Sequence, residues 1–141
     1  MPNLLFALAR AQEPPPALCG RADDIRVTLP WGDLLEGVAL ADPDVLGGLA
    51  ALARPGARLR IVVNGEPWST NAPKRMRRLP QLKPEYVRSE LVDRYADHGI
   101  AIKDARRLTA SEVDELHSTW AKKLRSGRDV DLTLIDAWLP G

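Results

Sequence analysis

The sequence predicts an α/β domain built on a mostly parallel sheet. Runs of apolar or alternating residues, typical of strands, take turns along the chain with segments of helical periodicity. Proline and glycine stand between these segments and mark their ends. With 141 residues, 45% of them apolar and 28% charged, the chain has the size and composition of one globular domain or part of one. We therefore expect residues 1–141 to form a single domain.

The first half of the chain contains three predicted strands, at 4–9, 25–29 and 59–63. The first is apolar throughout, as in a strand buried on both faces, and three consecutive prolines follow it at 14–16. Between the other two strands, Asp42-Pro43 begins a helix that runs to about residue 53, because proline is favoured at the first helical position. Arg54-Pro55-Gly56 ends that helix.

The second half begins with an irregular, basic linker at 64–83, which contains one glycine and three prolines. A helix follows at 84–97 and ends before Gly99, which can take the left-handed conformation of a helix cap. Another helix begins at Thr109 and reaches about residue 124, because Thr109 and Glu112 have the spacing of a capping box. Two further strands are predicted at 100–107 and 130–134.

The composition gives no signal of a disulfide, a metal site or a membrane segment. The single cysteine, Cys19, cannot form an internal disulfide and fits a reducing cytoplasm. Two histidines without a cysteine cluster form no recognisable zinc site. The apolar run at 4–9 is too short to span a membrane and lacks the basic start of a secretory signal. We expect a cytoplasmic protein without a metal or a membrane partner.

Positive charge is concentrated in the second half of the chain. The net charge is −2 over residues 1–70, +6 over 71–128 and −3 over 129–141. One basic cluster contains Lys74, Arg75, Arg77, Arg78, Lys83 and Arg88. A second contains Lys122, Lys123, Arg125 and Arg128. Clusters of this kind suit contacts to nucleic-acid phosphates, although a solvated surface is the common alternative.

Pro30-Trp31-Gly32 places a large aromatic ring just after the second predicted strand. Ligands gather at the carboxyl ends of the strands in sheets of this class, so this ring stands where a ligand is expected. A second ring, Trp120, lies in the segment 118–124, beside the second basic cluster. Two such rings suit a planar ligand such as a nucleobase. The alternative for Trp120 is a place in the core, since it recurs at helical spacing with Val113, Leu116 and Leu124.

The same motifs occur, in the same order, in a known family. They are Asn3-Leu4-Leu5-Phe6, Ala22-Asp23-Asp24-Ile25, Leu29-Pro30-Trp31-Gly32-Asp33-Leu34-Leu35, Leu79-Pro80-Gln81-Leu82 and Ser118-Thr119-Trp120-Ala121-Lys122-Lys123-Leu124. Together they resemble the aminoglycoside-resistance methyltransferases that modify N1 of adenine 1408 in 16S ribosomal RNA. The resemblance runs from residue 3 to about residue 130.

The resemblance implies a partial class I, Rossmann-like methyltransferase sheet that lacks the N-terminal strands. The family's glycine-rich turn and ribose-binding acid have no counterpart in this sequence, so the chain looks like the C-terminal part of such a domain. The implied cofactor is S-adenosylmethionine. The implied partner is 16S rRNA within the small ribosomal subunit, and a complete protein is expected to act as a monomer. We expect this chain alone to bind the cofactor weakly or not at all.

The resemblance also implies roles for individual residues. Trp31 and Trp120 match the tryptophans that stack on the flipped target adenine. The cofactor pocket is matched by Ala11, Gln12, Thr28, Asp33 and Ser118. RNA contacts are expected from Lys74, Arg75, Arg77, Arg78, Lys122, Lys123, Arg125 and Arg128. After Arg128 the family continues with basic residues, whereas this chain has Asp129-Val130-Asp131, a difference that weakens or shifts the RNA contact.

The implied reaction needs stacking and alignment more than acid–base catalysis. N1 of adenine carries its own lone pair, so no general base is needed for its attack on a sulfonium methyl group, and alignment of the reacting atoms carries the rate. Two other functions fit the sequence. One is a noncatalytic RNA-binding remnant, or pseudoenzyme, that lacks the cofactor half. The other is a methyltransferase-like domain that acts on another RNA or on a small molecule.

Overall fold

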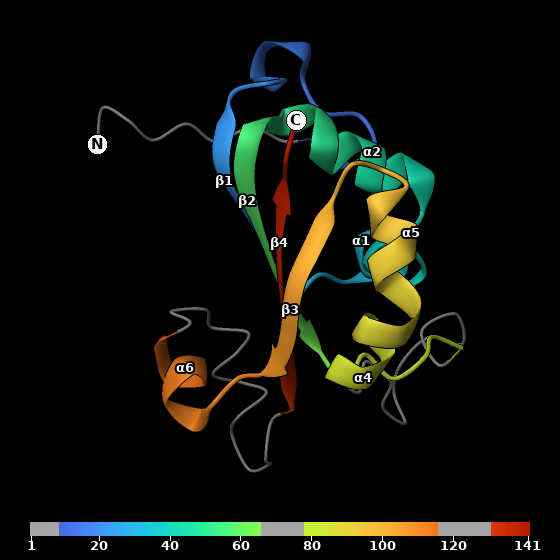
Figure 1. Ribbon diagram of the computed structural model, residues 1–141, viewed down its shortest axis with the longest axis vertical. Coiled ribbons are helices and arrows are strands. Elements are labelled where there is room, and N and C mark those ends of the chain that lie inside the picture. The colour runs from blue at the N-terminus through green and yellow to red at the C-terminus, as the bar shows by residue number, and fades with distance from the viewer. Residues whose placement is uncertain (1–8, 66–77, 116–130) are drawn as a thin grey trace.

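A four-stranded sheet with most of its helices on one face forms the centre of the protein (Figure 1). The computed structural model describes residues 9–65, 78–115 and 131–141. The strands are β1 (Ala22–Thr28), β2 (Ala53–Asn64), β3 (Ala101–Arg107) and β4 (Leu132–Leu139). They lie in the order β1-β2-β4-β3, which confirms the predicted α/β class.

The sheet is mixed. β1 pairs with β2 in parallel, whereas β4 pairs antiparallel with both β2 and β3. Three of the described strands therefore run in the same direction and β4 alone is reversed. The prediction of a mostly parallel sheet is wrong for the pairing, because β4 lies between β2 and β3 and makes two of the described ladders antiparallel.

More of the described helices lie on one face of the sheet than on the other. The helices α1 (Gly32–Leu40) and α2 (Pro43–Leu52) lie on one side of the sheet, together with a continuous helical segment made of α4 (Pro84–Tyr86), the π-helical turn η2 (Val87–Leu91) and α5 (Val92–Ala96). The short helix α6 (Ala110–Glu115) lies on the other side (Figure 1). A 3-10 turn, η1 (Pro16–Leu18), precedes β1.

Local sequence signals set the helix ends as predicted. The Asp42 side chain accepts a hydrogen bond from the Asp44 amide (2.8 Å) at the start of α2, with Pro43 as the first helical residue. Gly99 has a φ of +76°, and the Ile100 amide donates to the Tyr95 carbonyl (3.1 Å) to close the helix. Both caps depend on residues within a few positions of one another, which is why the sequence alone predicts them.

Several predicted boundaries need correction. The helix α1 was not predicted, because its nine residues are bounded by Pro30 and interrupted by Gly37, which hide its short apolar stripe. The strands β2 and β4 are longer than 59–63 and 130–134, because each pairs with a neighbour over most of its length. The predicted strand at 4–9, the linker beyond residue 65 and the end of the last helix fall mainly outside the described residues.

The main core lies between the sheet and the helices. Side chains alternate along β1 and β2, so Ile25, Val27, Leu59, Ile61 and Val63 point toward the helices and are buried. A smaller apolar cluster lies on the opposite face, against α6. The helix-covered face is thus a closed core, while the other face keeps polar side chains available near α6.

Two tyrosines fix α1 against the following helical segment. The buried Tyr95 hydroxyl donates to the Val38 carbonyl (2.7 Å), and the half-buried Tyr86 hydroxyl donates to the Ala39 carbonyl (2.8 Å). These carbonyls belong to the last turn of α1, where helical partners run out. Burial accordingly raises the pKa of Tyr95.

Replacing Tyr95 with phenylalanine is expected to lower the free energy of unfolding by about 1–3 kcal/mol, since the Val38 carbonyl then stays buried without a donor. Urea unfolding measures the change. The matched variant Tyr86→Phe should lose less, because its carbonyl partner can be reached by water beside a half-buried side chain. Identical midpoints for Tyr95→Phe and the parent would contradict this account.

Candidate functional site

Trp31 stands on a sharp turn at the carboxyl end of β1. Leu29 and Gly32 flank it with φ values of 49° and 62°, and Pro30 fixes its own φ through its ring. Trp31 itself is extended and caps the start of α1 (φ −134°, ψ 165°). The Leu29 amide still donates to the Val62 carbonyl of β2 (2.8 Å), which ties the turn to the sheet. Backbone constraints therefore position Trp31.

Trp31 is about half exposed to solvent. The residue is 51% exposed, and Leu40, at the far end of α1, is the other large apolar residue exposed among the described residues. An aromatic ring on a fixed turn offers a flat apolar face to a planar ligand. This exposure agrees with the prediction that Trp31 is not a core residue, and its stacking role stays a prediction.

A turn at residues 10–13 reaches the same edge of the sheet. The Glu13 amide donates to the Arg10 carbonyl (3.0 Å), and Ala11 and Gln12 are half-buried at the tip of this turn. The Arg10 guanidinium lies 3.8 Å from the Asp33 carboxylate in the first turn of α1, an exposed ion pair. The structure thus brings three of the predicted cofactor residues together from distant parts of the chain.

Gly48 allows this turn to sit against α2. A Cβ atom added at Gly48 would overlap the Ala11 carbonyl oxygen and crowd the Gln12 backbone. The neighbouring Gly47 is exposed, and a Cβ there would meet nothing within 4 Å. Of these two glycines, only Gly48 is needed for the close approach of the turn at residues 10–13 to the backbone of α2.

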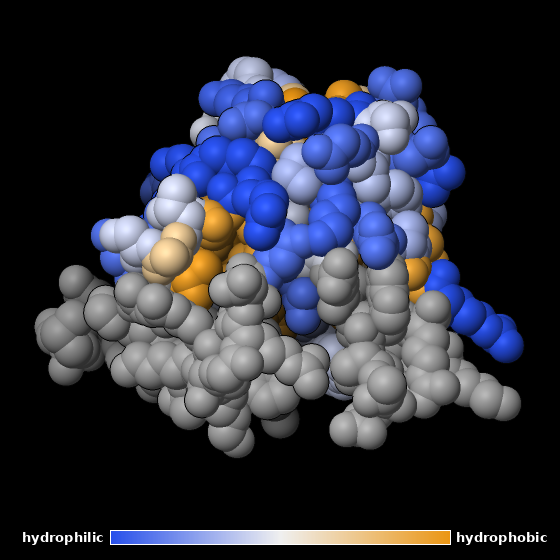
Figure 2. Space-filling view, turned by 90° about the horizontal axis from the view of Figure 1, so that it is seen from below, coloured by the Kyte–Doolittle hydropathy of each residue, from blue (hydrophilic) through white to orange (hydrophobic). Residues whose placement is uncertain are grey.

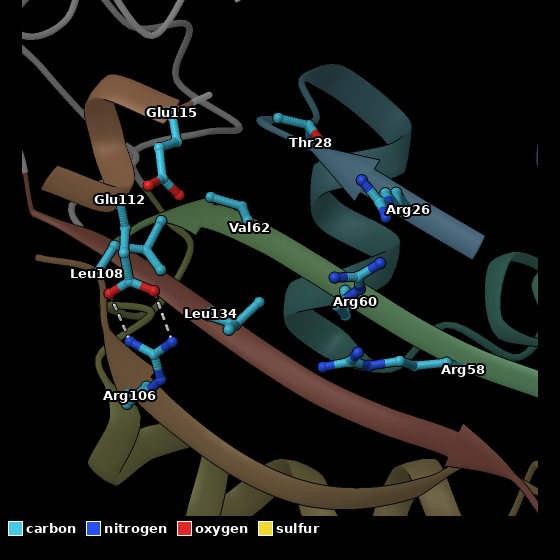
Figure 3. Close-up of a pocket in the computed structure, with 10 residues that line it drawn as sticks. All are labelled: Arg26, Thr28, Arg58, Arg60, Val62, Arg106, Leu108, Glu112, Glu115 and Leu134. Carbon is cyan, nitrogen blue, oxygen red and sulfur yellow. Dashed lines mark hydrogen bonds and ion pairs between the residues drawn. The ribbon is translucent and has the colours of Figure 1, made fainter. Parts of the chain in front are cut away.

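Thr28, the fourth described cofactor candidate, points to the opposite side of the sheet. It lines a cavity of about 350 Å³ on the face that carries α6, near the carboxyl ends of β1 and β2 (Figure 3). The floor of the cavity includes Val62, Leu108 and Leu134, and its rim is charged. The remaining candidate, Ser118, lies outside the described residues.

Four arginines that were not predicted as site residues surround this cavity: Arg26, Arg58, Arg60 and Arg106. Arg60 Nη2 lies 2.7 Å from Asp24 Oδ2, and Arg58 Nε lies 3.3 Å from Asp136 Oδ1. Arg58 and Arg60 are two positions apart along β2, and this spacing is the available signal, because it places them on one face. The acidic partners of these two arginines come from neighbouring strands and cannot be read from local sequence.

The charged pairs hold the rim in place. Arg106 donates to both Glu112 carboxylate oxygens (2.7 and 2.6 Å), as Figure 3 shows. The Thr109 amide donates to Glu112 and the Glu112 amide donates to the Thr109 hydroxyl, so the predicted capping box is confirmed. The Arg106 bonds, with that amide, lower the pKa of Glu112 to about 2. Burial raises the pKa of Asp24, but Arg26 and Arg60 outweigh it and the net shift is downward.

The predicted RNA-binding residues are mostly outside the described part of the chain. Arg78 is described and exposed. Trp120, Lys74, Arg75, Arg77, Lys122, Lys123, Arg125 and Arg128 are not described. Seen from the end that carries α4 and α6, the described surface is largely hydrophilic with small apolar areas (Figure 2).

Two members of the first basic cluster are engaged inside the protein instead. Lys83 forms an ion pair with Asp131, and Arg88 donates to the Ala105 carbonyl (2.6 Å). These contacts tie the helical segment to the sheet. The cluster predicted for phosphate contacts is therefore smaller than its sequence suggests.

Over residues 9–65, 78–115 and 131–141, no three His, Cys, Asp or Glu side chains are grouped to hold a metal ion. No helix within these ranges is long and apolar enough to cross a membrane.

The chain is similar to proteins of one family. The family model described as NpmA, 16S rRNA (adenine(1408)-N(1))-methyltransferase, matches residues 1–139. A protein of that description from Streptoalloteichus hindustanus is 39% identical over 92% of this chain and 59% of its own length. The chain thus spans about three fifths of that relative.

Solved structures show the same likeness. The 16S rRNA methyltransferase KamB matches with a TM-score of 0.87 and 35% identity, over 99% of this chain and 64% of its own. A tryptophan variant of the 16S rRNA (adenine(1408)-N(1))-methyltransferase from Catenulisporales acidiphilia, crystallised with the cosubstrate SAM, matches with a TM-score of 0.83 and 38% identity. It covers 94% of this chain and 60% of that one. The α/β sheet is therefore part of a methyltransferase fold.

Proposed function

The chain belongs to the 16S rRNA (adenine(1408)-N(1))-methyltransferase family, and from that premise we propose that it forms part of an enzyme that methylates N1 of adenine 1408 in 16S rRNA. The methyl donor in this proposal is S-adenosylmethionine, and the modification confers aminoglycoside resistance. The protein acts in the cytoplasm, as a monomer, on the small ribosomal subunit. Residues 1–141 make up one part of a single methyltransferase domain.

The exposed Trp31 carries this proposal. An enzyme that modifies N1 must take the adenine out of its stack, because N1 otherwise lies within base pairs or between neighbouring bases. Stacking on an aromatic side chain offsets the loss by about 1–3 kcal/mol per base. Trp31 is fixed by its backbone and is half exposed, so a base can reach it, as such a stacking platform requires. Trp120 provides the second ring.

The neighbouring residues fit a donor bound beside Trp31. Ala11, Gln12 and Asp33 would line its pocket at the same sheet edge, and Ser118 would come from the segment of Trp120. Thr28 lies at the end of β1 but on the opposite face of the sheet, so it would not contact the donor from this side. S-adenosylmethionine supplies a sulfonium methyl group that the N1 lone pair can attack directly. The residues of this chain then serve to hold the adenine and exclude water, so that N1 faces the methyl carbon.

Methylation of small ribosomal subunits tests the proposal. The complete gene product is incubated with bacterial small subunits and labelled S-adenosylmethionine, and the rRNA is analysed by primer extension, which stops at N1-methyladenine because its pairing edge is blocked. A stop at adenine 1408 supports the proposal. Label at another nucleotide, or salt-sensitive binding of subunits without any label, would instead favour one of the two alternatives, an enzyme for another RNA or a noncatalytic RNA-binding protein.

A further inference from the structure

Asp131 joins segments that the sequence predicts to contact RNA. Its carboxylate forms an ion pair with Lys83 Nζ through Oδ2, and Arg107 Nε lies 2.9 Å from Oδ1 without the alignment of a hydrogen bond. The Asp131 side chain is 18% exposed and that of Lys83 27%, whereas the Arg107 side chain is 65% exposed, so the carboxylate is largely shielded and one of its two partners faces solvent. Lys83 ends the basic linker at 64–83 and Arg107 ends β3.

The backbone around Asp131 makes the same junction. Its carbonyl accepts from the Gly65 amide (2.7 Å), and the Gly65 carbonyl accepts from the Leu82 amide (2.8 Å). A Cβ at Gly65 would come within 3.1 Å of the Asp131 carbonyl oxygen, so the approach is tight. The Leu108 amide donates to the Leu132 carbonyl (2.9 Å). Gly65, Leu82, Leu108 and Asp131 therefore lie together where β2 and β3 end and β4 begins.

The cations beside Asp131 change the effect expected of its negative charge on RNA binding. Asp131 looked like a negative charge that weakens an RNA contact, since it follows the second basic cluster in the sequence. In the structure it is held between two cations, Lys83 and Arg107, so these three side chains together carry one net positive charge. Because two opposite charges lie beside the carboxylate, its repulsion of a nearby phosphate is offset by theirs.

We propose that Asp131 is a positioning residue for methyl transfer, which holds the ends of β2, β3 and β4 together at the edge of the sheet where β1 ends before Trp31. This inference rests on the proposed function for its effect on the reaction. The local effect, a clamp between these strand ends, follows from the contacts of Lys83, Arg107 and Gly65 alone.

The test compares Asp131→Asn with Asp136→Asn in the complete protein. Asp136 lies on β4, the strand that follows Asp131 directly, and accepts from Arg58 (3.3 Å), so it is a matched ion-paired carboxylate away from the junction. Hydrogen exchange is measured at the amides of Gly65, Leu82 and Leu108. We expect exchange at least about tenfold faster in Asp131→Asn, with the β1–β2 ladder and the Asp136→Asn protein unchanged. Equal exchange in the two variants would overturn the clamp, whether or not the parent methylates RNA.

Kinetics then test the effect on the reaction. We expect kcat for methyl transfer to fall by about 10- to 100-fold in Asp131→Asn, since small misplacements of reacting groups cost rates of this order. The KM for subunits should stay the same or fall, because the substitution removes one negative charge beside the predicted RNA-binding segments. A rise in activity with tighter RNA binding would mean that Asp131 acts only as a repulsive charge, and would overturn the positioning role. An inactive parent with the expected exchange would count against the proposed function and leave the clamp supported.

Discussion

Replacing Trp31 with alanine is expected to reduce methylation of adenine 1408 by about 5- to 150-fold, the equivalent of losing 1–3 kcal/mol of base stacking. The fold should survive, because the residue is 51% exposed and the turn is fixed by backbone geometry on both sides of it. Exposed substitutions of this type usually change stability by less than about 0.5 kcal/mol. Primer extension on treated subunits measures the activity, and urea unfolding measures the stability.

Leu40→Ala is the matched control for Trp31→Ala. Leu40 ends the same helix, α1, and is 47% exposed, so both variants remove a large apolar side chain from the surface of one element. Leu40→Ala should methylate at the parental rate. A strong stop at adenine 1408 with Trp31→Ala, or an equal loss in both variants, would remove Trp31 from the acceptor site.

Replacing Gly48 with alanine is expected to displace the turn at residues 10–13 and weaken donor binding by about tenfold or more. The added methyl group would overlap the Ala11 carbonyl, and neither α2 nor the turn can yield without moving backbone. Overpacking of this kind costs about 1–3 kcal/mol of stability. Calorimetry with S-adenosylmethionine on the complete protein measures the first effect, and urea unfolding the second.

Gly47→Ala separates this contact from the helical preference of alanine. Gly47 is exposed in the same helix, and a side chain there would meet nothing within 4 Å. Alanine at this position should raise stability by about 0.5–1 kcal/mol and leave donor binding unchanged. If Gly48→Ala has the same stability and the same donor binding as Gly47→Ala, the position of the turn at residues 10–13 does not depend on its contact with Gly48 of α2.

Features that depend on neighbouring residues could be predicted from the sequence. The caps at Asp42, Gly99 and Thr109 were found because each is a local chemical pattern that satisfies backbone groups a few residues away. The strand that leads to Trp31 was also found, since alternation and the proline-glycine pair are visible without tertiary structure. The family was indicated by the order of such motifs along the chain.

Features that depend on pairing between distant segments could not be predicted in this way. Arg60 meets Asp24 from a strand 36 positions away, and Lys83 meets Asp131 over 48 positions. The insertion of β4 between β2 and β3 is of the same kind, because periodicity gives a strand but not its neighbours. Helix α1 was not predicted for a different reason. It has only nine residues, and its few apolar positions do not form a clear helical periodicity.

The central place of β4 has a consequence for how the protein folds. β3 contacts the rest of the described sheet only through β4, which follows it in the chain by more than twenty residues. During synthesis, β3 must therefore wait with an open edge until β4 has left the ribosome, and the contacts that complete the sheet have high contact order. The protein's late step is thus the entry of a strand into the middle of its sheet, which makes β4 the element whose loss would leave two ladders unformed.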